Sequence, residues 1–256
     1  HSAFRDLSPY SGLYSVSSQV DTLENCLFKT VNTTSGHRGA VSVTNSGSLY
    51  ILDCDFKDCH ASQTSNYTHP SGGAISVRIN NGGDPDIDII SSVFHDNTGV
   101  NPGGSSVSSY GGVAIGENTN GSGVGLVTLN VRNSTFNGTT LRLSNSIRGD
   151  IKFYLYNSIT SGISSNGSFV DAEIRNNNFS GASYITAGIS NIGNYVTTNN
   201  GYSSDPYGNI SETPSYVNQV TGDLRYQGSS PGIDCGDNTY TTTTYDADGN
   251  ARIWDG

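Results

Sequence analysis

The chain has 256 residues, a length that one elongated all-β domain accommodates as readily as two ordinary domains. Only 33% of its residues are apolar and 13% are charged, with 32 glycines, so the composition is typical either of disorder or of many short strands joined by turns. A formal charge of −10 opposes binding to nucleic acid or to an anionic membrane surface, and the sequence has no run of about 18 apolar residues that would cross a bilayer.

The aromatic content argues against disorder. The chain contains 15 Tyr and 8 Phe, and its Val and Ile residues fall in regularly patterned segments. Stacked coils suit such a sequence, because each coil buries its inward side chains against the next and a thin apolar core then suffices.

One short motif returns along the chain. It begins with an apolar residue, continues to Asn or Asp and then Ser or Cys, and ends with Phe, as in Leu-Glu-Asn-Cys-Leu-Phe at 23–28. Another apolar or small residue usually lies two positions before each copy. The further copies are at 51–56, 89–94, 131–136 and 174–179, with a weaker one at 155–160.

The spacing within the motif predicts a strand, a bend and a second strand. Apolar residues at a period of two indicate a strand, and Asn or Asp suits a bend because both tolerate left-handed backbone geometry. In the copy at 51–56 we expect Leu49, Ile51, Cys54 and Phe56 to point inward, with Asp53 at the bend. Stacked coils would then place the bend residues in an Asn ladder.

A glycine-rich element precedes several copies of the motif. It occurs at 36–43, 72–77 and 111–115, where glycines lead into alternating apolar residues. Glycine allows close approach of neighbouring backbones, so each element predicts a turn that enters a further core-facing strand.

These patterns predict an all-β fold, a single-stranded right-handed parallel β-helix, or solenoid, with irregular loop insertions. We expect one domain over residues 1–256. Regular coils should span about 20–190, followed by an irregular C-terminal coil and closing segment over about 191–256.

The paired strands, Gly-Gly-Ala-Ile and then Asn-Ser/Cys-x-Phe, resemble the coils of secreted bacterial right-handed β-helix proteins, the pectate-lyase-like superfamily in the broad sense. The segment 213–253 is similar to the closing segment of exported bacterial β-helix proteins that are often surface-anchored, although Cys235 replaces a small residue there. The resemblance implies a secreted or cell-surface location, and a sorting region is expected beyond residue 256. It implies no single activity, because the superfamily includes lyases, hydrolases and adhesins.

Catalytic residues are not assigned from the sequence. A polysaccharide lyase needs a basic residue beside a group that neutralises a carboxylate, and no pair among the basic candidates forms a lyase motif. A glycosidase needs two carboxylates at a fixed distance, but the acidic residues fit bends and outward strand positions. The basic candidates are His37, Arg38, Lys57, Arg78, His95 and Lys152; the acidic ones are Asp53, Asp55, Asp58, Asp84, Asp86 and Asp88.

Calcium is the one candidate cofactor. Asp246, Asp248 and Asn250 have the first three oxygen positions of a calcium loop. Gly249 comes too early for an EF-hand, and no Glu follows at the required distance. A solvated turn that closes the last coil is therefore the favoured interpretation of this segment.

The four cysteines allow several arrangements. Cys26 and Cys54 hold the same motif position, so they could pack as stacked thiols or form a disulfide across coils. A Cys54–Cys59 bridge is a third arrangement, and Cys235 lies far along the chain. We favour packing, because free cysteine is commonly buried.

The sequence predicts a noncatalytic extracellular surface protein, such as an adhesin, a stalk or a structural subunit. Self-assembly is part of this prediction, since terminal coils expose unpaired strand edges. The alternatives are a carbohydrate-active enzyme, either a polysaccharide lyase or a glycoside hydrolase, and a carbohydrate-binding module. The expected partners are thus polysaccharides or further copies of the chain.

Overall fold

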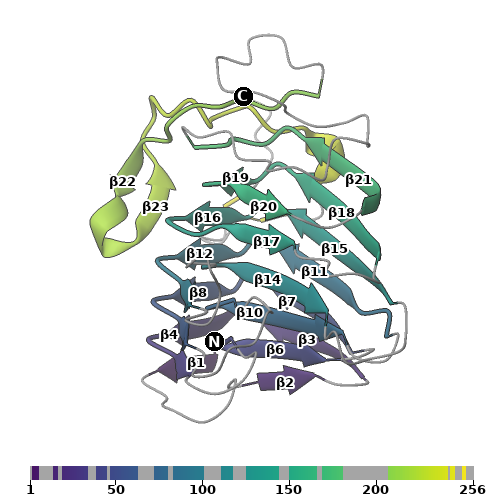
Figure 1. Cartoon of the computed structure of the whole chain (residues 1–256). Helices are drawn as coiled ribbons and strands as arrows, with labels where there is room; N and C mark the ends of the chain where they lie inside the picture. The colour runs from purple at the N-terminus through teal and green to yellow at the C-terminus, as the bar shows by residue number, and fades with distance from the viewer. Residues whose placement is uncertain are drawn as a thin grey trace.

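The chain forms a parallel β-helix, in which strands of the same direction stack rung upon rung (Figure 1). The computed structural model describes residues 2–5, 14–16, 19–33, 39–44, 47–62, 72–79, 83–100, 111–117, 125–143, 150–165, 169–180, 207–241, 243–245 and 250–251. Within these residues, no helix is long and apolar enough to cross a membrane.

Three six-stranded parallel sheets form the wall of the coil. Sheet A contains β1 (Ser2–Arg5), β4 (Cys26–Lys29), β8 (Asp55–Lys57), β12 (Val93–His95), β16 (Thr135–Asn137) and β19 (Ile159–Thr160). Sheet B contains β2 (Tyr14–Val16), β6 (Val41–Thr44), β10 (Ile75–Ile79), β14 (Val113–Glu117), β17 (Leu141–Leu143) and β20 (Ile163–Ser165). Sheet C contains β3 (Val20–Glu24), β7 (Ser48–Leu52), β11 (Asp86–Ile90), β15 (Leu126–Arg132), β18 (Asp150–Tyr156) and β21 (Phe169–Arg175).

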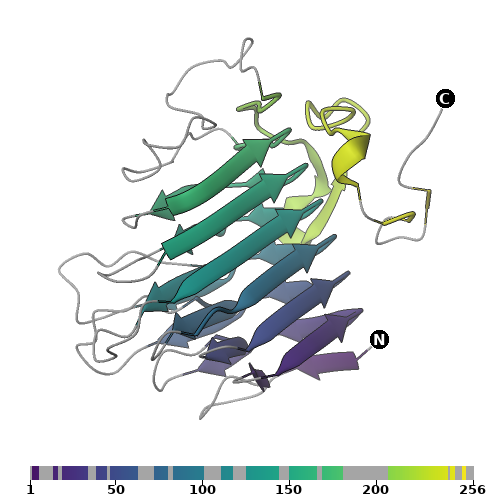
Figure 2. The ribbon, with the colours of Figure 1, turned by 90° about the vertical axis from the view of Figure 1, so that its right-hand side faces the viewer.

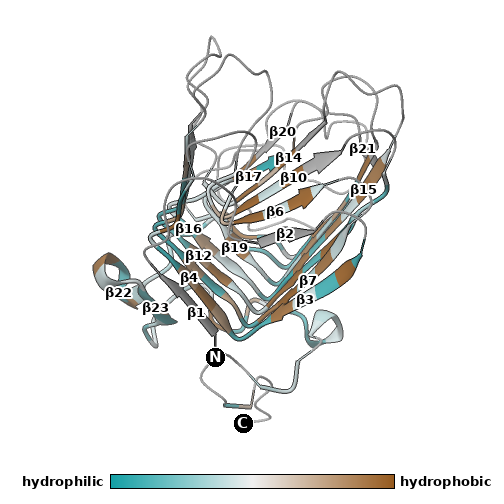
Figure 3. Cartoon of the chain, turned by 90° about the horizontal axis from the view of Figure 1, so that it is seen from below, coloured by the Kyte–Doolittle hydropathy of each residue, from teal (hydrophilic) through white to brown (hydrophobic). Residues whose placement is uncertain are grey.

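Each turn of the coil passes through sheet B, then sheet C, then sheet A. Sheet C forms the broad flat face seen in Figure 2. Most of the buried side chains of the strands are apolar, and Figure 3 shows the coil end-on with its hydrophobic residues in brown. A short fourth sheet follows sheet A and contains β5 (Asn32–Thr33), β9 (His60–Ser62) and β13 (Thr98–Val100).

The bend between sheets C and A is made by one left-handed residue in every turn. Asp53 has φ of 49°, which confirms its predicted place at the bend. Asn and Asp adopt this backbone geometry more readily than most residues. The bend residues are Asn25, Asp53, Ser91, Asn133, Asn157 and Asn176.

The predicted register is confirmed around this bend. Leu49, Ile51, Cys54 and Phe56 are all buried. Their alternation places two apolar residues inward before the bend and two after it, because the left-handed residue shifts the strand phase by one.

A column of stacked phenylalanines runs through the core behind sheet A. The ring centroids of Phe28 and Phe56 are 4.6 Å apart, those of Phe56 and Phe94 4.8 Å, and those of Phe94 and Phe136 4.4 Å. Phe4 of β1 pairs in register with Phe28. Strand pairing therefore begins before residue 20, in a segment that has no copy of the motif to reveal it.

A buried hydrogen-bonded ladder lies one residue after the bend. The backbone N–H of Ser92 donates to Ser134 Oγ at 3.1 Å, and the Ser92 hydroxyl donates to the carbonyl of Ile90 at 2.9 Å. The bend residues instead stand half-exposed or exposed, apart from buried Ser91. The ladder continues through Cys54, Ser92, Ser134, Ser158, Asn177 and Asn209.

Glycine is required where sheet B begins. A Cβ atom on Gly111 would lie 1.9 Å from the carbonyl oxygen of Asn97, and one on Gly73 would lie 2.3 Å from that of Cys59. Any side chain at these positions would push adjacent backbones apart, which is the close approach predicted from the glycine-rich elements.

The C-terminal segment leaves the coil and folds back along its flank. Ile210 still pairs with Asn178 as a last rung. Beyond it, β22 (Tyr216–Asn218), a 3-10 turn η1 (Gln219–Thr221) and β23 (Asp223–Tyr226) form an antiparallel pair, called here the C-terminal hairpin. It lies beside sheet A (Figure 1), and a second 3-10 turn, η2 (Asn238–Tyr240), follows.

Replacing the central phenylalanine tests the aromatic column. Phe94→Ala should lower the free energy of unfolding by about 3–5 kcal/mol, because the stacked neighbours cannot close the cavity. Val93→Ala is the matched control on the same strand, where the side chain points outward and the loss should stay below about 1 kcal/mol. Urea unfolding measures both; equal losses for the two variants would contradict the assignment of inside and outside.

Candidate functional site

A cleft of about 420 Å³ lies where the C-terminal segment covers the corner between sheets C and A. We call it the corner cleft. Its coil side is formed by Asn133, Ser134, Thr135, Asn157, Ser158, Ile159 and Asn176, and its other side by Tyr226, Gly232, Ile233, Asp234, Cys235, Gly236, Asn238, Thr241 and Ala251.

The repeat itself builds the coil side of the corner cleft. Asn133, Asn157 and Asn176 are the bend residues of three consecutive turns. Their positive φ angles turn the side chains away from the core, and parallel pairing stacks them at about 4.8 Å. The bend position of the motif therefore produces a line of amide side chains at the surface.

Reciprocal contacts hold the C-terminal segment over this line. The Asn157 amide nitrogen donates to the carbonyl of Asp237 at 2.8 Å, and the Asp237 N–H donates back to Asn157 Oδ1 at 2.8 Å. The ring of Tyr240 stacks on that of Tyr156 with centroids 4.3 Å apart. These contacts fix the part of the wall around Asp237 and Tyr240 against the coil.

The lining suits a neutral, hydroxyl-rich ligand. Amide and hydroxyl side chains offer both donors and acceptors, and Tyr226 adds an aromatic ring whose phenol has a pKa raised by burial. Asn133 Nδ2 is shielded and has no acceptor among the described residues. Asp234 is the only carboxylate among the lining residues, and one carboxylate does not supply the pair that glycoside hydrolysis uses.

Cys235 brings a thiol to the cleft but not an activated one. Its Sγ donates to the carbonyl of Gly232 at 3.1 Å, and burial raises the pKa of the thiol. A nucleophilic cysteine needs a lowered pKa. Nothing in the local sequence around Cys235 indicates that it faces the bend residues.

All four cysteines are free thiols, which confirms packing over the two disulfide alternatives. Burial raises the pKa of Cys54 and of Cys59 to about 12. Cys54 Sγ donates to the carbonyls of Leu23 and Leu52 at 3.4 and 3.3 Å. It therefore occupies a ladder position that serine holds in later turns.

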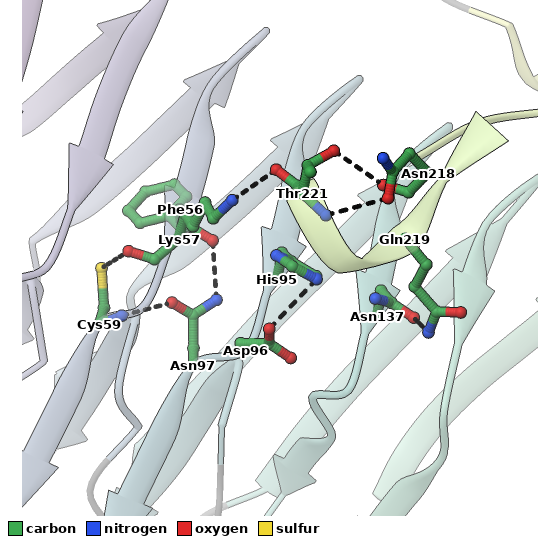
Figure 4. Close-up of polar contacts among 10 residues, drawn as sticks. All are labelled: Phe56, Lys57, Cys59, His95, Asp96, Asn97, Asn137, Asn218, Gln219 and Thr221. Carbon is green, nitrogen blue, oxygen red and sulfur yellow. Dashed lines mark hydrogen bonds and ion pairs between the residues drawn. The ribbon is translucent and has the colours of Figure 1, made fainter. Parts of the chain in front are cut away.

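Two basic candidates from the sequence meet on the outer face of sheet A. Lys57 of β8 pairs in register with His95 of β12. The C-terminal hairpin covers both (Figure 4), and Lys57 Nζ donates to the carbonyl of Thr221 at 2.7 Å. His95 Nε2 lies 3.2 Å from a carboxylate oxygen of Asp96.

The other basic candidates lie elsewhere. Lys152 is on β18 of sheet C, and Arg78 is in β10 of sheet B. His37 and Arg38 fall outside the described residues.

The acidic candidates divide between separate faces. Asp53 and Asp58 stand at the two bends that flank β8, with φ of 49° and 52°. Asp55 points outward from sheet A, whereas Asp86 and Asp88 point outward from sheet C. Asp84 accepts the N–H of Leu126 at 2.7 Å. The acidic candidates therefore occupy bends and outward positions on separate sheets.

The calcium prediction falls largely outside the described residues. Asp246 and Asp248 are not described, and Asn250 is exposed. Within the described part of the chain, no group of three His, Cys, Asp or Glu residues is placed to hold a metal ion. Calcium binding by Asp246, Asp248 and Asn250 stays a prediction.

No protein-family model, curated protein or solved structure matches this chain. The likeness to secreted β-helix proteins therefore rests on the motifs and on the parallel coil itself.

The raised thiol pKa values predict selective reactivity. At pH 8, a pKa of about 12 in place of 9.0 leaves roughly a thousandfold less thiolate on Cys54 and Cys59. In the native chain, both should resist iodoacetamide, whereas unfolding in urea should expose them to rapid alkylation. Because folding keeps these thiols protonated, their contribution to stability should be lost progressively between about pH 9 and pH 12. Peptide mass spectrometry measures the labelling; native alkylation of either residue at the unfolded rate would contradict its burial.

Proposed function

We propose that this chain is a noncatalytic protein of an extracellular surface, adhesin-like in role, which binds a neutral carbohydrate in the corner cleft. The proposal rests on the corner cleft, in which the bend residues of consecutive turns face Tyr226, Asn238 and Thr241. The cleft has a volume of about 420 Å³. This volume falls within the roughly 300–1,000 Å³ typical of ligand sites.

The chemistry of the lining favours sugar hydroxyls over other ligands. A hydroxyl both donates and accepts a hydrogen bond, and so do the Asn, Ser and Thr side chains of the cleft. The Tyr226 ring offers an apolar face against which the C–H surface of a sugar packs. Asp234 and the net charge of −10 disfavour an anionic ligand in this cleft.

The architecture supports a surface role. The ladder from Cys54 to Asn209 ties successive turns together with side-chain hydrogen bonds. A solenoid of this kind presents a site on a stiff support, and each turn depends mainly on its neighbours. The resemblance of the coil motif to secreted bacterial β-helix proteins supports the extracellular location.

A polysaccharide lyase is the second candidate, since one observation favours it. Lys57 and His95, both residue types that serve as bases, lie side by side on sheet A. It ranks second because His95 is buried beneath the C-terminal hairpin.

Removing an exposed cleft amide tests the binding function. Asn238→Ala should weaken binding of a neutral oligosaccharide about tenfold, the effect of one lost hydrogen bond of about 1.4 kcal/mol. A glycan array identifies the sugar, and isothermal titration calorimetry measures the affinity. Asn130→Ala, an outward amide on sheet C, is the matched control and should leave the affinity unchanged.

Turnover assays distinguish the two candidates. The proposed function predicts neither new reducing ends nor the absorbance of unsaturated uronates after incubation with polysaccharides, with or without calcium. Product formation that Lys57→Ala abolishes would establish the lyase instead. A glycan array without any binder would count against the proposed function.

A further inference from the structure

The turn of the C-terminal hairpin lies directly on two basic side chains of sheet A. Gly222 has φ of +83°, and a Cβ built on it would lie 2.7 Å from Lys57 Nζ and 3.2 Å from His95 Nδ1. Both distances are those of hydrogen bonds between nitrogen and oxygen. An oxygen atom at that point would accept a hydrogen bond from Lys57 Nζ, and a second one from His95 Nδ1 when both ring nitrogens carry a proton.

These two side chains belong to a row of nitrogen-bearing residues. Lys29, Lys57, His95 and Asn137 pair in register on four adjacent strands of sheet A. Parallel pairing spaces them at about 4.8 Å along the coil axis. The chain has only 12 Lys and Arg residues in total, so the stacking of two lysines beside a histidine is a notable concentration.

His95 supplies an independent sign of an unfilled site. Its side chain is only 4% exposed, and Nδ1 has no hydrogen-bond partner among the described residues. Leaving a buried polar atom unpaired destabilises a fold. The unpaired nitrogen points to the place where the turn of the hairpin sits.

The hairpin already imitates a ligand at this row. The carbonyl of Thr221 accepts a hydrogen bond from Lys57 Nζ at 2.7 Å, and Gln219 donates its amide to Asn137 Oδ1 at 2.9 Å (Figure 4). A carbonyl oxygen therefore occupies one position that an oxyanion would take. His95 receives no such group.

Internal contacts hold the hairpin together. Tyr216 and Tyr226 stack with centroids 5.9 Å apart, and Asp223 pairs with Arg225. These contacts lie within the hairpin, so they survive if it lifts. At its tip, the side chain of Val220 is 91% exposed.

We propose that Lys57 and His95 form a binding site for an oxyanion, the sulfate or carboxylate group of a glycan, and that the C-terminal hairpin is an internal lid over it. Lys57 and His95 do not line the corner cleft, although Tyr226 of the hairpin does. Only the choice of a glycan as the bearer of the anion rests on the proposed function.

Neighbouring carboxylates limit the ligand. Asp55 points outward on the same strand as Lys57, and its pKa is raised by burial against the pull of Lys57, His95 and Lys29. Asp96 lies against His95 and is largely exposed. A densely charged polymer would be repelled, whereas an isolated anionic group on a sugar would meet the two nitrogens. Binding should weaken as salt screens the contact.

Four probes identify the ligand chemistry. Inorganic sulfate, a galacto-oligosaccharide with one sulfate, a galacto-oligosaccharide with one galacturonate and a neutral galacto-oligosaccharide are each titrated into the full chain by calorimetry. Hydrogen exchange of residues 216–226 is measured with each probe. At least one anionic probe should bind and accelerate exchange in the hairpin, because it displaces the lid. Slower exchange on binding would overturn the lid.

Two variants loosen the lid. Gly222→Ala should raise the affinity for the anionic probe by roughly five- to tenfold, since the apparent Kd falls as the open fraction grows. Gly228→Ala is its control, because a Cβ there meets no atom within 4 Å. Gln219→Ala removes the bond to Asn137 without altering a glycine and should shift the affinity in the same direction.

Two further variants remove the site. Lys57→Gln and His95→Gln should each weaken anion binding about tenfold or more, as expected for hydrogen bonds to charged groups. Lys152→Gln makes the same charge change on sheet C and should have no effect.

The outcomes separate this proposal from the corner cleft. If inorganic sulfate binds but neither anionic glycan does, the oxyanion site stands and the glycan assignment falls. If no anionic probe binds either the natural chain or Gly222→Ala, the site itself is overturned. Binding of the neutral oligosaccharide that Asn238→Ala weakens, with Lys57→Gln unchanged, reports on the cleft alone.

Discussion

The structure depends on a single left-handed residue in each turn, at the bend between sheets C and A. This residue shifts the strand phase by one, so that the apolar residues before the bend and those after it all face the same core. The position after the bend is buried, and from Ser92 onward its hydroxyl or amide oxygen accepts an N–H from the preceding turn. Stacking of phenylalanines, sheet register and the thin core all follow from the repetition of this one geometry.

The bend also produces the surface on which function is proposed. Because the left-handed residue turns outward, a repeat that stabilises the core simultaneously lines the corner with amides such as Asn133, Asn157 and Asn176. The C-terminal segment uses one of them, Asn157, as its anchor and leaves the others beside the cleft. The residues that form the structural repeat therefore also form the proposed binding surface.

Sheet A shows a second use of the same regularity. Parallel pairing without register shifts brings Lys29, Lys57 and His95 into line, although 28 and 38 residues separate them along the chain. The C-terminal hairpin covers part of this line and leaves His95 Nδ1 without a partner among the described residues. In a parallel coil, similar side chains therefore line up wherever the sequence spacing matches the length of a turn. A segment that folds back over the coil then determines which of these side chains reach solvent.

The sequence by itself determined the coil, the inward positions around Asp53 and the packing of Cys54 as a thiol, because periodicity and bend chemistry are local properties. It did not reveal the pairing of Phe4, since that strand carries no copy of the motif, or the buried hydrogen-bonded ladder one residue after the bend. Only the tertiary structure decided that Lys57 meets His95, that Asp55 and Asp88 face different sides, and that Cys235 lies against the bend residues. In each case the residues lie at least 30 positions apart along the chain. Irregular turn lengths hide their register until the turns are stacked.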